Sequence, residues 1–306
     1  MNIKFNFYDI YGFALPGFLL LAVLWLPFGL IAKNWPDPEF SSALVGVILA
    51  YFAGHVLQTV ALNVIPSSFL GGRYPSNVFL DKNDPNHAFS QEFKNRLANQ
   101  IETTFQLNVL PDVSGETADA VRRDAFFLCR SALIKSKTVI YAEQFEGLYA
   151  LMRGLSAAFA LAVAYYVGWA YSNLWLGQWS GRLVLAGIIM ALVALLIRDR
   201  HEHFEWLKKR SRLVKKWSKW VIIGSLLLAA FASGHYLGQS IVGTSEHRNL
   251  LLAAAVFSFF ASERCYSGYK YFAQEFAKAV YRDFSNYEKP SEQHSTKPGP
   301  DTEDEP

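Results

Sequence analysis

The sequence predicts an all-α integral membrane protein, a bundle of six spans with a helical insert on the cytoplasmic side. Two observations carry this prediction: long stretches without charge, and an uneven distribution of Lys and Arg around them. About 20 apolar residues are needed to cross a hydrocarbon core of about 30 Å. The stretches without a charged residue are Ile10–Ala32, Phe40–Gly72, Gly154–Gly181, Leu183–Ile197, Trp220–Ser245 and Asn249–Ser262.

The basic residues give the expected orientation of these spans. If each stretch crosses once, one side of the membrane carries 26 of the 29 Lys and Arg, and the other carries only Lys33, Arg182 and Arg248. Cytoplasmic loops of membrane proteins are enriched in Lys and Arg. We therefore expect a protein of the bacterial inner (cytoplasmic) membrane with both termini in the cytoplasm.

Three of the six stretches have features that bear on how they cross. Ile10–Ala32 is too long for a secretory signal, so we expect it to remain as an anchor, bent near Pro16-Gly17 and Pro27. Leu183–Ile197 and Asn249–Ser262 are short, and span only if flanking arginines snorkel. A four-span alternative places these two segments as re-entrant or surface elements.

The segment between the second and third spans is the only sizeable polar part of the chain. Asp84-Pro85 has the pattern of a helix N-cap, and the apolar stripe from Phe89 to Phe105 follows it. A second helix is expected over Thr117–Ile134. A third is expected to begin near Lys137, with a stripe from Tyr141 to Phe159 that crosses Arg153 into the third span.

These elements divide the chain into alternating membrane and cytoplasmic parts. The predicted parts are a hairpin of spans (1–66), the helical insert (67–153), a second hairpin (154–197), a basic amphipathic segment (198–219), a third hairpin (220–262), a tail helix (263–287) and a disordered tail (288–306).

Small residues recur every four positions in three spans, as at Gly46, Ala50 and Gly54 in the second. Corresponding sets are Ser156, Ala160, Ala164, Gly168 and Ser172 in the third span, and Ala230, Gly234 and Gly238 in the fifth. Such faces let helix backbones approach closely. They predict packing within the bundle, with a homo-oligomer as the alternative use of the same faces.

Polar side chains inside the spans are the first candidate site. His55 and Gln58 lie in the second span, and His235 and Gln239 lie in the fifth. Because a polar group facing lipid is unfavourable, we expect these four to point inward and pair. They either line a polar path or simply fix packing. No Asp or Glu lies in any of the six stretches, which disfavours a proton- or cation-coupled transporter.

Charged residues at the inner ends of the spans form the second candidate site, namely Arg198, Arg200, His203, Glu263 and Arg264. The segment 198–219 carries nine basic residues against three acidic ones, which favours anionic lipid headgroups over nucleic acid as its partner. Arg198 and His203 also have the Arg-x4-His spacing, which resembles the catalytic motif of HEPN-type ribonucleases over six residues only.

No pattern for a metal site, a cofactor or a nucleotide is found, so no cofactor is expected. The sequence therefore favours a non-enzymatic role. In this hypothesis the cytoplasmic helices dock a protein partner or a signal and are coupled to the bundle, as in a gated pore or a membrane effector. The alternatives are an assembly subunit of a membrane complex, and an enzyme acting on lipid headgroups through His201, His203 and Glu263.

Overall fold

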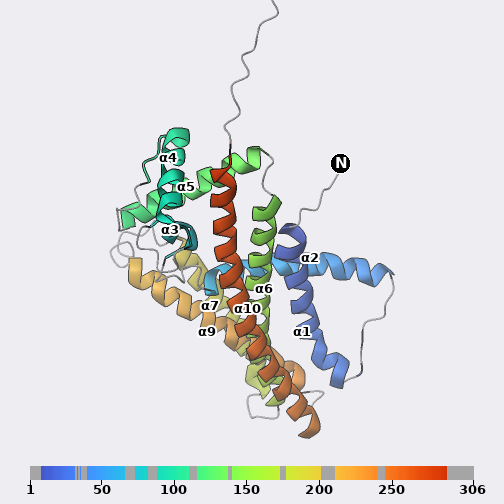
Figure 1. The fold of residues 1–306 in the computed structure, drawn as a ribbon. Helices are drawn as coiled ribbons and strands as arrows, with labels where there is room; N and C mark the ends of the chain where they lie inside the picture. Colours follow the sequence, from blue (N-terminus) through green and yellow to red (C-terminus); the bar gives the residue numbers. More distant parts are fainter. Residues whose placement is uncertain are drawn as a thin grey trace, which may run out of the picture. The chain divides into compact units, whose positions relative to one another are not determined.

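In the part of the chain that it describes, the computed structural model is all-helical (Figure 1). It describes residues 8–31, 33, 35, 40–65, 73–81, 88–109, 116–136, 140–172, 177–200, 211–239 and 245–287. The elements are η1 (Asp9–Ala14), α1 (Leu15–Ile31), α2 (Phe40–Val64), α3 (Pro75–Val78), α4 (Gln91–Phe105), α5 (Glu116–Lys135), α6 (Ile140–Ala170), α7 (Gly177–Arg200), α9 (Ser211–Gly238) and α10 (Ser245–Ser285).

The chain divides into two compact units. Unit 1 comprises Met1–Pro75 and Ile140–Ala277, and so contains α1, α2, α6, α7, α9 and most of α10. Unit 2 comprises Ser76–Val139 and Lys278–Pro306, with α4, α5 and the last turns of α10. The first turns of α6 thus belong with the apolar helices, and the end of α10 belongs with the insert.

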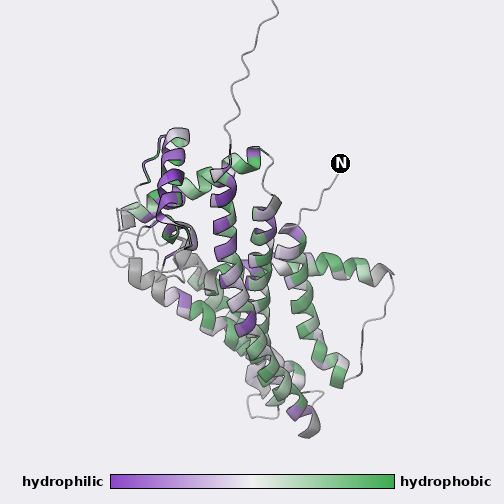
Figure 2. Ribbon diagram, in the orientation of Figure 1, coloured by the Kyte–Doolittle hydropathy of each residue, from purple (hydrophilic) through white to green (hydrophobic). Residues whose placement is uncertain are grey.

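Five helices are long and apolar enough to cross a membrane, as expected of an integral membrane protein. Their candidate spans are Asp9–Ile31, Ala43–Leu62, Tyr141–Ala170, Trp217–Gly238 and His247–Ser285. The predicted fourth span falls in α7, whose described apolar part, Trp179–Ala194, is shorter. Figure 2 shows the hydrophobic character of α1 and α2 and the hydrophilic character of α4. The crossing of the membrane six times stays a prediction.

The first span begins with a π-helical turn, η1, and continues as α1 through Pro27. Proline lacks an amide hydrogen, and its ring clashes with the carbonyl four residues earlier. Pro16 therefore disfavours an α-helical hydrogen bond to Gly12, and the wider π turn accommodates it. The sequence predicts an irregular helix near Pro16-Gly17; the structure places the irregularity, the π-helical turn η1, just before these residues.

Glycines allow two close helix crossings in unit 1. A Cβ placed on Gly54 of α2 would lie 1.9 Å from the carbonyl oxygen of Phe13, and one on Gly17 would lie 1.8 Å from that of Ala50. At the second crossing, a Cβ on Gly234 of α9 would lie 2.0 Å from the carbonyl oxygen of Tyr165 in α6. Both crossings use the predicted small-residue faces, whereas Gly46 has no atom within 4 Å of such a Cβ.

Contacts along α6 give the relative directions of its neighbours. α1 runs parallel to α6, since the hydroxyl of Tyr166 donates to Val23 O and Trp169 packs on Phe28. α10 runs antiparallel to α6, since Tyr149 lies near Tyr269 and Phe159 lies near Phe257, with ring centroids 6.2 and 6.4 Å apart. The predicted topology has the first and third spans crossing the membrane in one direction and the sixth span in the opposite direction. The directions of α1, α6 and α10 are consistent with it.

In unit 2, α4 begins later than the sequence suggested. Asp84 and Pro85 lie outside the described residues, and Phe89 precedes the helix. Ser90 is the N-cap, with an extended backbone and a side chain that accepts a hydrogen bond from Phe93 N at 3.2 Å. A serine so placed satisfies one of the free amides of the first turn, so the helix starts at Gln91. The second predicted helix is confirmed as α5.

The end of α10 fills the core of unit 2. Val280, Tyr281 and Phe284 are each 0% exposed. The hydroxyl of Tyr281 donates to Ser76 O at 2.6 Å, and the amide of Gln100 donates to Phe284 O at 2.9 Å. The insert therefore builds its core around a helix that arrives from the far end of the chain.

Charged groups are also buried in unit 2. Asp81, Lys94 and Arg122 are all at most 3% exposed. Asp81 accepts from Arg122 Nη1 at 3.1 Å through its carboxylate and from Lys94 through its backbone carbonyl. Burying a charge is costly unless it is paired and hydrogen-bonded; here Arg122 and Asp81 form an ion pair, and Lys94 donates to a backbone carbonyl.

The α9 crossing can be tested with two glycines of the same helix. We expect Gly234→Ala to lower the free energy of unfolding by about 1–3 kcal/mol, because the added methyl overpacks the contact with Tyr165. Gly224→Ala is the matched control, since no atom lies within 4 Å of a Cβ there; it should be neutral or stabilise by up to about 1 kcal/mol. Denaturant titration in detergent micelles measures both, and equal effects would contradict the crossing.

Cys129 of α5 gives a pH-dependent test of unit 2. Burial raises the pKa of the Cys129 thiol well above its usual range. An unfolded chain releases this proton near pH 8.5 whereas the folded chain keeps it, so stability is full below that pH and falls by about 1.4 kcal/mol per pH unit above it. Maleimide labelling of a Cys265→Ala variant, with increasing denaturant at pH 7.5 and 9.5, measures this loss. Rapid labelling of Cys129 in the absence of denaturant would contradict the burial of this thiol in the folded protein.

Candidate functional site: a polar node among the membrane helices

Arg153 lies within the long apolar helix α6 and is only 6% exposed. A buried guanidinium needs hydrogen-bond acceptors, because its charge is otherwise uncompensated in a medium of low dielectric. The side chain of Gln58, from α2, supplies one. Gln58 Oε1 accepts from Arg153 Nε at 3.2 Å and from Nη2 at 3.0 Å.

The other end of the Gln58 amide joins two more segments. Its Nε2 donates to Gly12 O of η1 and to Ala150 O of α6, each at 2.7 Å. Both amide hydrogens and the amide oxygen of this 2%-exposed side chain are therefore used. We call Gly12, Gln58, Ala150 and Arg153 the polar node, and it holds η1, α2 and α6 together.

Two residues explain why the node forms here. Because Pro16 has no amide hydrogen, Gly12 O cannot receive the usual bond from residue 16, and the Gln58 side chain reaches it instead. Gly154 lets that side chain approach α6, since a Cβ at this position would lie 2.7 Å from Gln58 Nε2 and 2.8 Å from Pro16 Cβ.

Aromatic side chains complete the surroundings of Arg153. The guanidinium carbon lies 5.6 Å from the ring centroid of Tyr149, and Tyr269 of α10 interacts with the same guanidinium. Tyr149 also packs on Phe276 of α10, with centroids 5.5 Å apart. Among the described residues, no carboxylate forms an ion pair with Arg153. Its charge is thus held by a neutral amide and by π faces.

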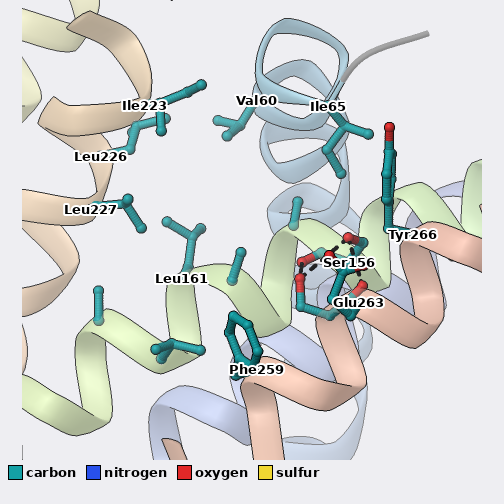
Figure 3. Close-up of a pocket in the computed structure, with 15 residues that line it drawn as sticks. Val60, Ile65, Ser156, Leu161, Ile223, Leu226, Leu227, Phe259, Glu263 and Tyr266 are labelled. Carbon is teal, nitrogen blue, oxygen red and sulfur yellow. Dashed lines mark hydrogen bonds between the residues drawn. The ribbon is translucent and has the colours of Figure 1, made fainter. Parts of the chain in front are cut away.

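An apolar cleft of about 540 Å³ opens one turn further along α6 (Figure 3). Its walls come from α2, α6, α9 and α10, and most of them are aliphatic. At one end Ser156 and Ser262 bond reciprocally: Ser156 Oγ donates to Ser262 O at 3.1 Å, and Ser262 Oγ donates to Ser156 O at 2.9 Å. Glu263 and Tyr266 line the same end.

His235 lies in a different part of unit 1. It is fully buried beside the α6–α9 crossing, with its backbone nitrogen 2.9 Å from a Cβ placed on Gly168. Its Nδ1 lies 3.3 Å from Gln239 Nε2, which can only donate, so Nδ1 accepts and Nε2 carries the proton. That Nε2 makes no hydrogen bond to any described residue, and neither does the buried hydroxyl of Ser172.

The four predicted intramembrane residues do not form one line. Gln58 acts at Arg153 and His235 acts near Gly168, which is about 22 Å further along α6 at 1.5 Å per residue. His55 is exposed and stacks on Phe13 with ring centroids 3.8 Å apart. His55 therefore does not face the interior of the bundle, contrary to the expectation. Gln58 and His235 are buried, and the side chain of Gln239 contacts that of His235.

The predicted inner-end charges are placed only in part. Glu263 and Arg264 are exposed on α10, and Glu263 lines the cleft. Arg198 and Arg200 end α7, but their side chains lie outside the described part of the structure, as do His201 and His203 entirely. Among the residues that are described, no group of His, Cys, Asp and Glu is arranged to hold a metal ion.

Arg153 is the site residue that sequence reasoning missed. The predicted insert ends at Arg153, although the apolar stripe from Tyr141 to Phe159 continues on both sides of it. A charge inside a continuous helical stripe is a signal that the helix needs an acceptor there. Which residue supplies the acceptor is not visible in the stripe, because Gln58 lies 95 positions away.

Comparison of the chain with protein-family models, with curated proteins and with solved structures finds no match. What the chain does is therefore argued from its own geometry.

The polar node predicts a marked loss of stability for Gln58→Leu. With the acceptor removed, the buried guanidinium loses two charge-assisted hydrogen bonds, which should cost about 2–4 kcal/mol. The double variant Gln58→Leu/Arg153→Met should regain at least half, because no unpaired charge is left behind. SDS titration in mixed micelles measures these values.

His55→Leu is the matched control for this series, three residues away on the same helix. Because His55 is exposed and forms no hydrogen bond through its ring with a described residue, the change should stay within about 0.5 kcal/mol of wild type. A double variant no more stable than Gln58→Leu alone would show that the node does not act through Arg153.

Proposed function

We propose that this chain is a non-enzymatic membrane protein in which unit 2 docks a protein partner or a signal and α10 conveys its state to the helices of unit 1. The observation that carries the proposal is the continuity of α10. It is one helix from Ser245 to Ser285, about 60 Å long at 1.5 Å per residue. It supplies a candidate span and also supplies buried core residues of unit 2.

Each step along α10 has a defined contact. In unit 2, Tyr281 and Phe284 are enclosed by the insert, so a change in its packing acts directly on this helix. In unit 1, Phe276 and Tyr269 of the same helix contact Tyr149. Tyr269 also interacts with Arg153, so a shift of α10 bears on the polar node.

The expected output is a rearrangement of the helices that the node holds. Gln58 joins η1, α2 and α6 through one amide, so releasing it frees three segments together. In a homo-oligomer such a rearrangement would open a path for ions, with Gln58, His235 and Gln239 as its polar groups. This is the gated pore or membrane effector that the sequence favoured.

Two other roles make different demands on the chain. An assembly subunit of a larger complex needs the helical bundle but no path for ions. Liposomes that contain such a subunit would not conduct ions. An enzyme acting on lipid headgroups would depend on Glu263 with His201 and His203. Glu263 lines one end of the cleft, and this observation favours the enzyme as the second candidate function.

Ion flux through vesicles tests the proposal. Wild-type protein in liposomes should conduct K⁺ slowly, whereas Gln58→Leu should raise the flux by releasing the node. Phe284→Ala should raise it too, by loosening α10 within unit 2. His55→Leu and Phe127→Ala are the matched controls; Phe127 is an aromatic of unit 2 that is 56% exposed.

Each pattern of flux has one meaning. A rise in both Gln58→Leu and Phe284→Ala, with quiet controls, supports the gate and its connection through α10. A rise in Gln58→Leu alone overturns the connection. No flux in any variant overturns the gate and favours the assembly subunit.

A further inference from the structure

The cleft beside the polar node has the dimensions and polarity of a site for one lipid chain. Its volume of about 540 Å³ lies within the range of small-molecule sites, about 300–1,000 Å³. Figure 3 shows Ile223, Leu226 and Leu227 of α9 on one side, and Phe259, Glu263 and Tyr266 of α10 on the other. The enclosed surface is almost entirely hydrocarbon.

The cleft has a direction, set by α6. Ser156 lies at its polar end, and Ala164, eight residues further along, lies at the apolar end, about 12 Å away at 1.5 Å per residue. One leaflet of a bilayer has a hydrocarbon depth of about 15 Å, half of the full core. An acyl chain entering from the polar end would therefore match the depth of a single leaflet.

The polar end has one charged recognition group among the described residues. Ser156 and Ser262 bond to each other, so their hydroxyls are already used. Among the described residues that line the cleft, Glu263 is the only charged one; it is exposed, and no described basic side chain forms an ion pair with it. A carboxylate in this position attracts a cationic hydrogen-bond donor and repels an anionic headgroup.

From this geometry we infer that the cleft binds a phospholipid with a primary ammonium headgroup, of the ethanolamine class. Its acyl chain lies between α6, α9 and α10, and its ammonium donates hydrogen bonds to Glu263. A choline headgroup is cationic but has no N–H donor, and a glycerol headgroup leaves the phosphate charge uncompensated. Both should bind more weakly in the same cleft.

The test uses the full chain in detergent with three lipids of identical acyl chains: phosphatidylethanolamine, phosphatidylcholine and phosphatidylglycerol. Native mass spectrometry measures how much of each stays bound. We expect phosphatidylethanolamine to be preferred about threefold to tenfold, the range for one charge-assisted hydrogen bond at a partly exposed site. Glu263→Gln, which keeps the size of the side chain, should abolish the preference.

A second pair of variants tests the location. Ala160→Phe fills the cleft and should reduce binding of all three lipids, whereas Gly46→Phe, where an added Cβ meets no atom of another segment within 4 Å, should change nothing. Equal retention of the three lipids by wild type, or a preference that survives Glu263→Gln, overturns recognition by Glu263. Unchanged binding in a folded Ala160→Phe variant overturns the cleft as the site.

Discussion

The structure of unit 1 depends on how the charge of Arg153 is accommodated by one neutral amide. An arginine at the centre of a membrane helix costs about 2.5–3.5 kcal/mol on insertion scales, and this is the upper limit for Arg153, which lies three residues from the polar end of the cleft. Two charge-assisted hydrogen bonds to Gln58 Oε1 are of the same order, so the guanidinium is tolerated only while Gln58 stays in place. The same amide holds Gly12 O and Ala150 O. The same side chain, Gln58, therefore both solvates the guanidinium of Arg153 and holds η1, α2 and α6 together.

The two units accommodate buried charge differently. Unit 2 pairs Arg122 with the carboxylates of Asp81, at 3.1 Å, and Asp119, at 3.7 Å, so its charge is balanced by groups of opposite charge. Unit 1 gives Arg153 only dipoles and π faces, which carry no net charge and are set by position alone. An arrangement of this kind is sensitive to small movements of the helices.

The apolar runs and the stripe from Tyr141 to Phe159 were enough to predict the helices of unit 1, including the continuity of α6 across Arg153. They were not enough to orient α2. That helix is apolar around its whole circumference, so periodicity did not distinguish the inward Gln58 from the exposed His55. The partners of Arg153 and the contribution of α10 to unit 2 both join residues about a hundred or more positions apart. The cap at Ser90 was missed because Asp84-Pro85 gives an equally good local pattern.

The composition of unit 2 has a consequence for biosynthesis. Gln100 bonds to the carbonyl of Phe284, 184 positions later. At about 5–20 residues per second, the ribosome needs about 10–40 s to make the intervening chain. During that interval α4 and α5 lack the aromatic side chains of Tyr281 and Phe284 that fill their core. The insert therefore completes its core only after all the apolar helices have been translated. A nascent chain whose translation stalls before that point exposes the apolar surface of α4 and α5 to chaperones and proteases.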